Sequence, residues 1–152
     1  VFASGGELKP VSLFKTGAPV AGSPAIKRET ALAVRRMLEL AVLPGGTAPR
    51  AQVSGYRVAG KTGTAHKLEG RGYAANRYVS SFVGFAPVSD PRIVVAVMID
   101  EPTAGQYYGG AVAAPVFSTV TGAALRMLGV PTDAPVDNVI LPPEGGEVRE
   151  ET

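Results

Sequence analysis

The sequence predicts an α/β fold of the α+β kind, in which an antiparallel sheet is flanked by helices. Two stretches carry apolar residues at helical spacing, and three others read as strands, the last two joined by a short proline-containing connection. The 19 glycines and 13 prolines argue against a helical bundle. With 152 residues, the chain has the material of one domain.

The first part of the chain is expected to hold an extended segment, a turn and a helix. Residues 8–15 alternate in polarity around a proline and predict an extended segment or edge strand, and residues 17–24 form a Gly/Pro-rich turn. Residues 27–42 predict a helix that ends at the Gly/Pro run 44–49. Its apolar face is formed by Ala31, Val34, Met37, Leu38 and Ala41.

Three strands are expected at about 56–65, 79–86 and 92–100. The connection 87–91 is short enough to make the last two strands antiparallel neighbours. Because both faces of Ile93–Ile99 are apolar, we expect this strand to be central and covered on both sides.

Two loops rich in tyrosine and glycine are expected at strand ends, near 66–78 and 101–109. A second helix is predicted at about 111–128, with Pro115 tolerated in its first turn. Its amphipathic stripe consists of Val112, Val116, Val120, Ala124 and Leu128. Residues 1–131 then make up the domain, and the proline-rich, acidic residues 132–152 predict a disordered tail.

The segment Gly55–Thr64 fits two catalytic motifs. Read as Gly-x-x-x-x-Gly-Lys-Thr it matches a phosphate-binding P-loop, and the apolar run ending in Asp100 would supply a magnesium-binding acid. A P-loop needs a buried strand before it and a helix after it. Glycines at 63, 70 and 72 break any helical pattern, and residues 56–64 favour an extended strand. The other interpretation is Lys61-Thr62-Gly63, the third motif of serine acyltransferases that react with β-lactams.

Four blocks in order carry a resemblance to a known family: Tyr56–Ala65, Arg77–Pro87, Asp90–Pro102 and Tyr107–Phe117. Together they resemble class B penicillin-binding proteins, and among these the division-specific, FtsI-like D,D-transpeptidases. The similarity runs from about residue 1 to residue 131. It implies the penicillin-binding transpeptidase or serine β-lactamase-like fold, of which this chain holds the C-terminal part.

The resemblance implies roles for four consecutive residues. Lys61 and Thr64 would be catalytic, with the Thr64 N–H as one donor of the oxyanion hole. The Thr62 and Thr64 hydroxyls would bind the terminal carboxylate of a D-Ala-D-Ala peptide, and Gly63 would let that peptide approach the strand. An ordinary surface strand with an ordinary lysine is the alternative.

Further substrate-binding residues are expected at two places. His66 follows the Lys-Thr-Gly-Thr motif and would contact substrate or a β-lactam, although an exposed strand end explains it better. Tyr107, Tyr108 and Gly109 resemble the family's cleft wall, or form only a strand-to-helix turn. Asp100 and the acid after it are expected to be structural.

The nucleophile is expected outside this chain. Ser12-x-x-Lys15 matches the Ser-x-x-Lys pattern literally, but Pro10 and the turn at Gly17 prevent the helix that would place both side chains on one face. The family's Ser-x-Asn motif does not occur here. We therefore expect the N-terminal half of the same transpeptidase domain, which lies upstream, to be a partner of this chain.

The resemblance also implies the remaining partners. They are peptidoglycan stem peptides, β-lactam antibiotics and divisome membrane proteins, met in the periplasm by a protein anchored upstream in the inner membrane. No cofactor is implied. A metal site is not expected from one histidine and no cysteine, nor nucleic acid from a formal net charge of +2. A D,D-carboxypeptidase, a serine β-lactamase and a non-catalytic β-lactam sensor remain alternatives.

Overall fold

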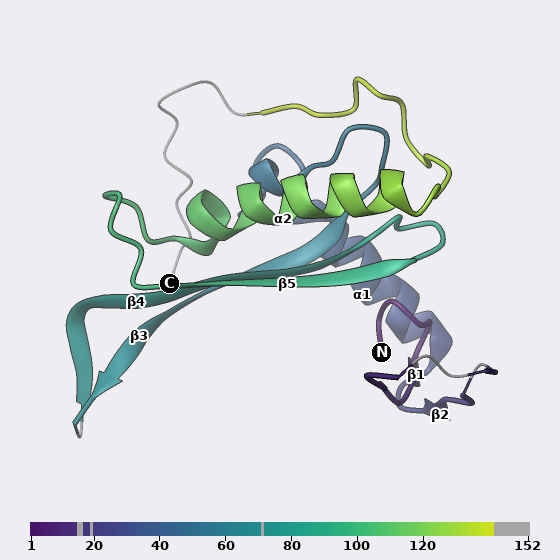
Figure 1. Ribbon diagram of the computed structural model, residues 1–152, viewed down its shortest axis with the longest axis horizontal. Helices are drawn as coiled ribbons and strands as arrows, with labels where there is room; N and C mark the ends of the chain where they lie inside the picture. Colours follow the sequence, from purple (N-terminus) through teal and green to yellow (C-terminus); the bar gives the residue numbers. More distant parts are fainter. Residues whose placement is uncertain (15–16, 19, 71, 142–152) are drawn as a thin grey trace.

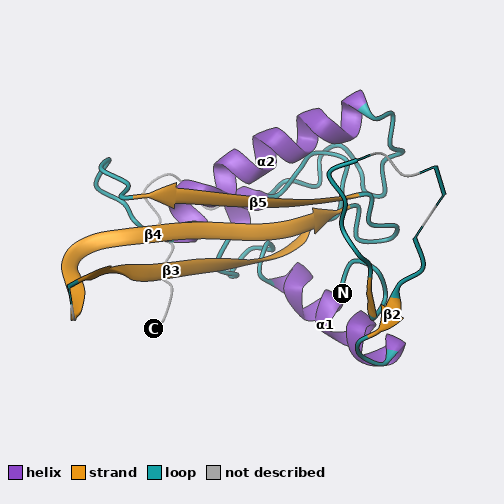
Figure 2. Cartoon of the chain, turned by 60° about the horizontal axis from the view of Figure 1, so that its bottom comes forward, coloured by secondary structure: helices purple, strands orange, loops and turns teal. Residues whose placement is uncertain are grey.

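The computed structural model describes residues 1–14, 17–18, 20–70 and 72–141. A three-stranded sheet lies between two helices, with α2 along one face and α1 on the other side, against the start of β3 (Figures 1 and 2). The elements are β1 (Glu7–Leu8), β2 (Ser23–Pro24), α1 (Arg28–Leu40), a 3-10 turn η1 (Pro49–Ala51), β3 (Ala59–Glu69), β4 (Gly72–Ala86), β5 (Ile93–Asp100) and α2 (Gly109–Met127). This arrangement confirms the predicted fold class. No helix among the described residues has the length and hydropathy of a membrane span.

The N-terminal part is less regular than the sequence suggests, apart from its helix. The extended segment predicted at 8–15 contains a strand only at Glu7–Leu8, which pairs antiparallel with Ser23–Pro24. Lys15 lies outside the described residues. Helix α1 matches its prediction, and Ala31 on the predicted face is fully buried, whereas Met37 on that face is 65% exposed.

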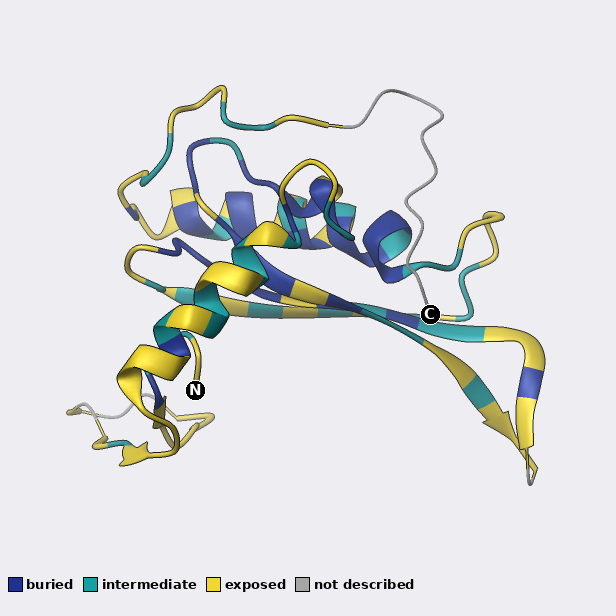
Figure 3. Cartoon of the chain, turned by 180° about the vertical axis from the view of Figure 1, so that it is seen from behind, coloured by how far each residue is buried: buried dark blue, intermediate teal, exposed yellow. Residues whose placement is uncertain are grey.

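The main sheet has the order β3-β4-β5, and both pairs are antiparallel. Strands β3 and β4 are much longer than predicted, because the residues expected to form a loop at 66–78 continue both strands beyond a register shift between His66 and Leu68. The predicted loop is therefore wrong. Figure 3 shows that this distal half of the hairpin is mostly exposed, whereas most of the buried positions lie in the half near the helices.

Strand β5 does not occupy the position that its composition predicted. It lies at an edge of the three-stranded sheet, and its residues alternate between half-buried and exposed. Val94 is 62% exposed and Met98 is 72% exposed, whereas Val95 and Val97 pack on the core. The apolar residues on its second face have no covering layer in the described chain, so the prediction of a central strand is wrong here.

The main core lies between α2 and the sheet. Phe82 of β4 and Phe117 of α2 are fully buried, with ring centroids 4.7 Å apart in an edge-to-face contact. Small residues such as Ala113 and Ala114 line the same face of α2, so the helix can approach the strands closely.

The stripe predicted from the spacing of α2 lies on the other side of this helix. Val116 is 42% exposed, Val120 is 46% exposed and Leu128 is 64% exposed. Because α2 is apolar on more than one face, spacing alone selects no buried face. Shape decides it, since the alanines and Phe117 fit against the strands.

The chain returns after α2 and binds the segment that precedes β3. Asn138 accepts the Gly55 N–H at 3.0 Å and donates to the carbonyls of Val53 and Tyr56 at 3.3 and 3.1 Å. The Gln52 side chain exchanges two hydrogen bonds with the backbone of Ile140 at 2.8 and 2.9 Å. Asn138 and Ile140, which belong to the tail expected from residue 132, are thus hydrogen-bonded to the segment that precedes β3. The rest of that tail, 142–152, lies outside the described residues.

Candidate active site

The lysine motif lies on an edge strand. Lys61, Thr62, Gly63 and Thr64 all belong to β3, which pairs only with β4 in the described part of the chain, so its other backbone edge faces no strand. Residues 59–69 are strand and not helix. This geometry lacks the helix N-terminus that a P-loop uses to hold phosphate. The P-loop reading is therefore wrong, and the strand can accept an extended peptide by backbone pairing.

The Lys61 ammonium lies against the next residue of the motif. Its Nζ donates to the Thr62 hydroxyl at 2.9 Å and to the Thr62 carbonyl at 3.1 Å. The Thr62 hydroxyl in turn donates to the hydroxyl of Thr47 at 3.3 Å. Thr62 is buried and Thr47 is half-buried, so the two hydroxyls form a small polar patch beside the ammonium. Thr47 was not predicted, because it stands in a Gly/Pro run that carries no motif.

Thr64 joins the strand to the beginning of α2. The Gly109 N–H, at the first residue of the helix, donates to the Thr64 hydroxyl at 3.1 Å. This contact satisfies one of the N–H groups that a helix start leaves without an intrahelical partner. Gly63 and Gly109 also approach each other closely, since a Cβ on Gly109 would lie 2.9 Å from the Gly63 carbonyl oxygen. A Cβ on Gly63 would lie 2.6 Å from the Ser81 hydroxyl, so a side chain at this position would require the Ser81 side chain to move.

Four aromatic rings lie in series along this side of the hairpin. Tyr78 and Tyr107 are stacked, with centroids 4.0 Å apart and an interplanar angle of 12°, and Tyr107 lies 4.5 Å from Tyr108. We call Tyr78, Tyr107 and Tyr108 the tyrosine wall. The His66 ring lies 4.5 Å from Tyr78, and its Nδ1 lies 3.0 Å from the Ala74 carbonyl oxygen. A carbonyl can only accept, so this contact needs the proton on Nδ1.

The predicted residues thus come together in two groups. Lys61, Thr62 and Gly63 lie on the proximal part of β3. Tyr107 and Tyr108 lie between β5 and α2, and Gly109 is the first residue of α2; Thr64 connects the two groups. His66 is exposed, as expected, but it lies within β3 and not at a strand end. Tyr78 was not predicted as a site residue, because it stood in the presumed loop.

A cluster of charges lies next to the tyrosine wall. Lys67 contacts Asp100 at 2.9 Å and Glu101 at 2.6 Å, and Arg77 contacts Glu101 at 2.5 Å and Glu69 at 3.6 Å. We call these five residues the hairpin charge cluster. Hydrogen bonds from Arg77 and then Lys67 lower the pKa of Glu101 to about 2, and the bond with Glu101 raises the pKa of Lys67. Every charge in this cluster has an opposite partner, consistent with the structural role expected for Asp100 and Glu101.

Ser12 does not have the setting of a nucleophile. It lies outside any helix, and its hydroxyl accepts the Phe14 N–H at 3.0 Å. The second residue of that pattern, Lys15, lies outside the described residues. Among the residues that the structure describes, no three His, Cys, Asp or Glu side chains are placed to hold a metal ion.

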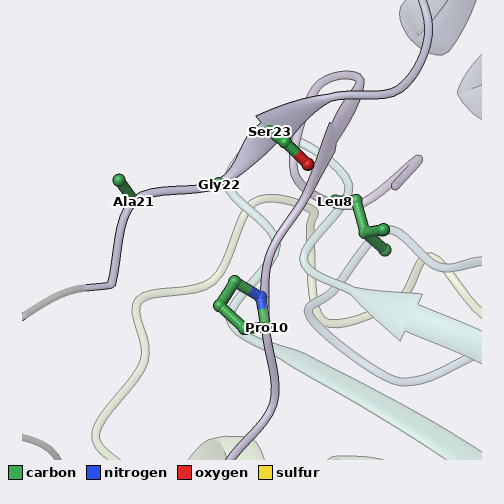
Figure 4. A pocket seen from close by; sticks show the side chains of 5 residues that line it. All are labelled: Leu8, Pro10, Ala21, Gly22 and Ser23. Atoms are coloured by element: carbon green, nitrogen blue, oxygen red, sulfur yellow. The ribbon is translucent and has the colours of Figure 1, made fainter.

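Two hollows are lined by neither the lysine motif nor the tyrosine wall. An open one of about 300 Å³ lies beside β1 and β2 and is lined by Leu8, Pro10, Ala21, Gly22 and Ser23 (Figure 4). A smaller one of about 140 Å³ lies between α1, residues 52–58 and the C-terminal segment. Neither is lined by a residue predicted to bind substrate, as expected if the substrate binds along a strand edge.

Comparison with known proteins shows the family to which this chain belongs. Residues 1–122 match the family described as "Penicillin binding protein transpeptidase domain". The chain belongs to this family.

Relatives of known name support this assignment. The chain is 47% identical over 133 residues to the probable peptidoglycan D,D-transpeptidase PenA of Neisseria flavescens, covering 88% of this chain and 33% of that protein. It is 42% identical over 129 residues to the peptidoglycan D,D-transpeptidase FtsI of Escherichia coli K12, covering 85% and 22%. The apo TP domain from Burkholderia pseudomallei penicillin-binding protein 3 matches with a TM-score of 0.81 and 53% identity, covering 88% of this chain and 41% of that chain. The chain therefore spans a third or less of these two curated relatives.

Proposed function

We propose that this chain is the C-terminal part of the catalytic domain of a peptidoglycan D,D-transpeptidase that cross-links stem peptides in septal wall synthesis. The observation that carries the proposal is the Lys61–Thr64 motif on an edge strand, in a chain that belongs to the transpeptidase family. The reaction passes through a serine acyl-enzyme whose nucleophile lies upstream of these residues. β-Lactams react at the same serine.

The substrate peptide pairs with the edge of β3 opposite β4, which faces no strand in the described part of the chain. Its terminal carboxylate is bound by the hydroxyls of Thr62 and Thr64 beside the Lys61 ammonium, and the Thr62–Thr47 contact supports Thr47 as a further member of this group. The Thr64 N–H donates to the oxyanion in the transition state. The tyrosine wall then contacts the side chain of the peptide or β-lactam.

The upstream half of the domain covers the apolar surfaces that this chain leaves exposed. These surfaces are the second face of β5, with Val94 and Met98, and the outer face of α2, with Val116 and Val120. Exposed apolar area of this kind is a binding surface or an aggregation hazard. In the assembled protein the domain lies in the periplasm, on an inner-membrane anchor, and meets divisome membrane proteins.

Labelling with a fluorescent penicillin tests the proposal. We expect covalent labelling of the intact transpeptidase and none of this chain alone. Replacing Lys61 with alanine in the intact protein is expected to abolish labelling, whereas replacing the exposed Lys27 is not, since it lies before α1 and far from β3 in the sequence. Labelling of the isolated chain at Ser12 would overturn the proposal.

Acceptor chemistry separates the alternative activities. A transpeptidase transfers the acyl group from a D-Ala-D-Ala donor to an added amine such as D-alanine or glycine. A carboxypeptidase or β-lactamase yields only the hydrolysis product, and a sensor domain is acylated but does not turn over. Formation of the amine adduct by the intact protein therefore decides between them.

A further inference from the structure

The loop between β5 and α2 is tied to the β3–β4 hairpin at both of its ends. At its start the Glu101 N–H donates to the Tyr78 carbonyl at 2.9 Å. At its end the Ser80 hydroxyl donates to the Tyr107 carbonyl. The loop that carries Tyr107 and Tyr108 is thus held against the part of β4 that carries Tyr78.

The Glu101 side chain adds further contacts to the first of these ties. Its carboxylate accepts hydrogen bonds from Lys67 of β3 at 2.6 Å and from Arg77 of β4 at 2.5 Å. One side chain of the loop is therefore bound to both strands of the hairpin. Charge-assisted bonds of this kind fix direction as well as distance.

The backbone of Glu101 indicates that its side chain matters. Its φ is 51°, and no other non-glycine residue in the described part of the chain has a positive φ. Glycine adopts this conformation without strain, whereas other residues adopt it at a cost. A glutamate at this position is explained if the hydrogen bonds of its carboxylate to Lys67 and Arg77 matter, because a glycine could not make them.

We propose that Glu101 is a positioning residue for the tyrosine wall and thereby sets the preference of the site for substrates and β-lactams with bulky side chains. This inference rests on the proposed function. The carboxylate fixes the start of the loop on Lys67 and Arg77, and the loop then presents Tyr107 stacked on Tyr78. From there the chain enters α2 at Gly109, whose N–H binds Thr64.

Stability alone is a poor measure of this role. Ion pairs between exposed side chains contribute little to the free energy of unfolding. The loop is also retained by the Tyr78 and Tyr107 backbone bonds, so losing the carboxylate is expected to loosen it and not to unfold the protein. The relevant measurement is the reactivity of ligands that differ only in the group facing the tyrosines.

The experiment uses the intact transpeptidase and two penams, benzylpenicillin and 6-aminopenicillanic acid, which lacks the aromatic side chain. We expect Glu101→Gln to reduce the acylation preference for benzylpenicillin by about three- to tenfold, the range for losing one aromatic contact. The rate with 6-aminopenicillanic acid is expected to stay within about twofold of the wild-type value.

The matched control is Glu69→Gln. Glu69 also pairs with Arg77, at 3.6 Å, but it lies on β3 and not on the loop. This variant is expected to keep the wild-type preference. Glu101→Gly removes the same carboxylate while relieving the backbone, so it tests the inference even if Glu101→Gln folds poorly, and it is expected to lose the preference too.

The outcomes distinguish failure of the positioning role of Glu101 from failure of the proposed function. An unchanged preference in a folded Glu101 variant, or an equal loss in the Glu69 variant, overturns the positioning role and leaves the proposed function intact. An equal fall in the rates of both penams also overturns it, since general damage to the site then explains the result. Failure of the wild-type protein to react with either penam overturns the proposed function itself.

Discussion

Replacing Gly109 with alanine probes the closest approach between α2 and the strand that carries the lysine motif. The new Cβ would lie 2.3 Å from the Ser81 carbonyl oxygen, 2.9 Å from the Gly63 carbonyl oxygen and 3.3 Å from the Gly63 nitrogen. All three are backbone atoms of β3 and β4, so no side-chain rotation relieves the overlap. The beginning of α2 must therefore move by about 1 Å to restore ordinary contacts.

Two effects follow from that displacement. Overpacking costs about 1–3 kcal/mol, and the better helix propensity of alanine offsets at most about 1 kcal/mol of it. The Gly109–Thr64 hydrogen bond, 3.1 Å long, is stretched at the same time. A displacement of about 1 Å in a catalytic site can lower a rate by about 100-fold, so we expect the acylation rate to fall by at least about tenfold.

Thermal unfolding and penicillin acylation of the intact transpeptidase measure these effects separately. The control is Gly72→Ala at the start of β4, where a Cβ meets nothing within 4 Å and the backbone is not left-handed. We expect the control to match the wild-type protein in both assays. Wild-type melting and acylation by Gly109→Ala would refute the argument that this approach is tight.

Three further predictions concern stability. Phe82→Ala is expected to lower the free energy of unfolding by about 3–5 kcal/mol, measured by urea denaturation, because the side chain is fully buried against Phe117. Asn138→Ala is expected to cost about 1–3 kcal/mol, since it leaves part-buried backbone groups without partners, whereas the exposed Asp137→Ala is expected to change little. The pKa of Glu101, lowered from 4.5 to about 2, means that its ion pairs stabilise the fold fully above about pH 4.5 and are lost as the pH falls toward 2. The loss of stability between about pH 4.5 and pH 2 should therefore be smaller in Glu101→Gln than in the wild type. Thermal unfolding at a series of pH values measures this loss, and identical pH profiles of the two proteins would contradict the prediction.

Much of the fold could be predicted from local pattern. Helix α1, helix α2, strand β5 and the turn before it follow from periodicity and from the placement of proline and glycine, which act over a few residues. The distal hairpin could not be predicted in this way. Residues 66–78 contain polar and small residues that are typical of a loop, but pairing with the opposite strand and the charge cluster make them extended.

The site shows the same division. The motif at Lys61–Thr64 could be identified from the sequence, because its four residues are consecutive and belong to one of the four blocks that resemble the family. Thr47 and Tyr78 could not, since neither belongs to a motif and each becomes relevant only through a neighbour in space, at Thr62 and Tyr107.

By itself, then, the sequence determined the strand identity of the lysine motif and the two helices, because these depend on steric and apolar preferences of neighbouring residues. Tertiary structure alone decided which face of α2 is buried, that β5 lies at an edge of the described sheet, and that Glu101 binds the hairpin. These features depend on which surfaces meet and which charges come within hydrogen-bonding distance, and such contacts join residues that are far apart in the chain.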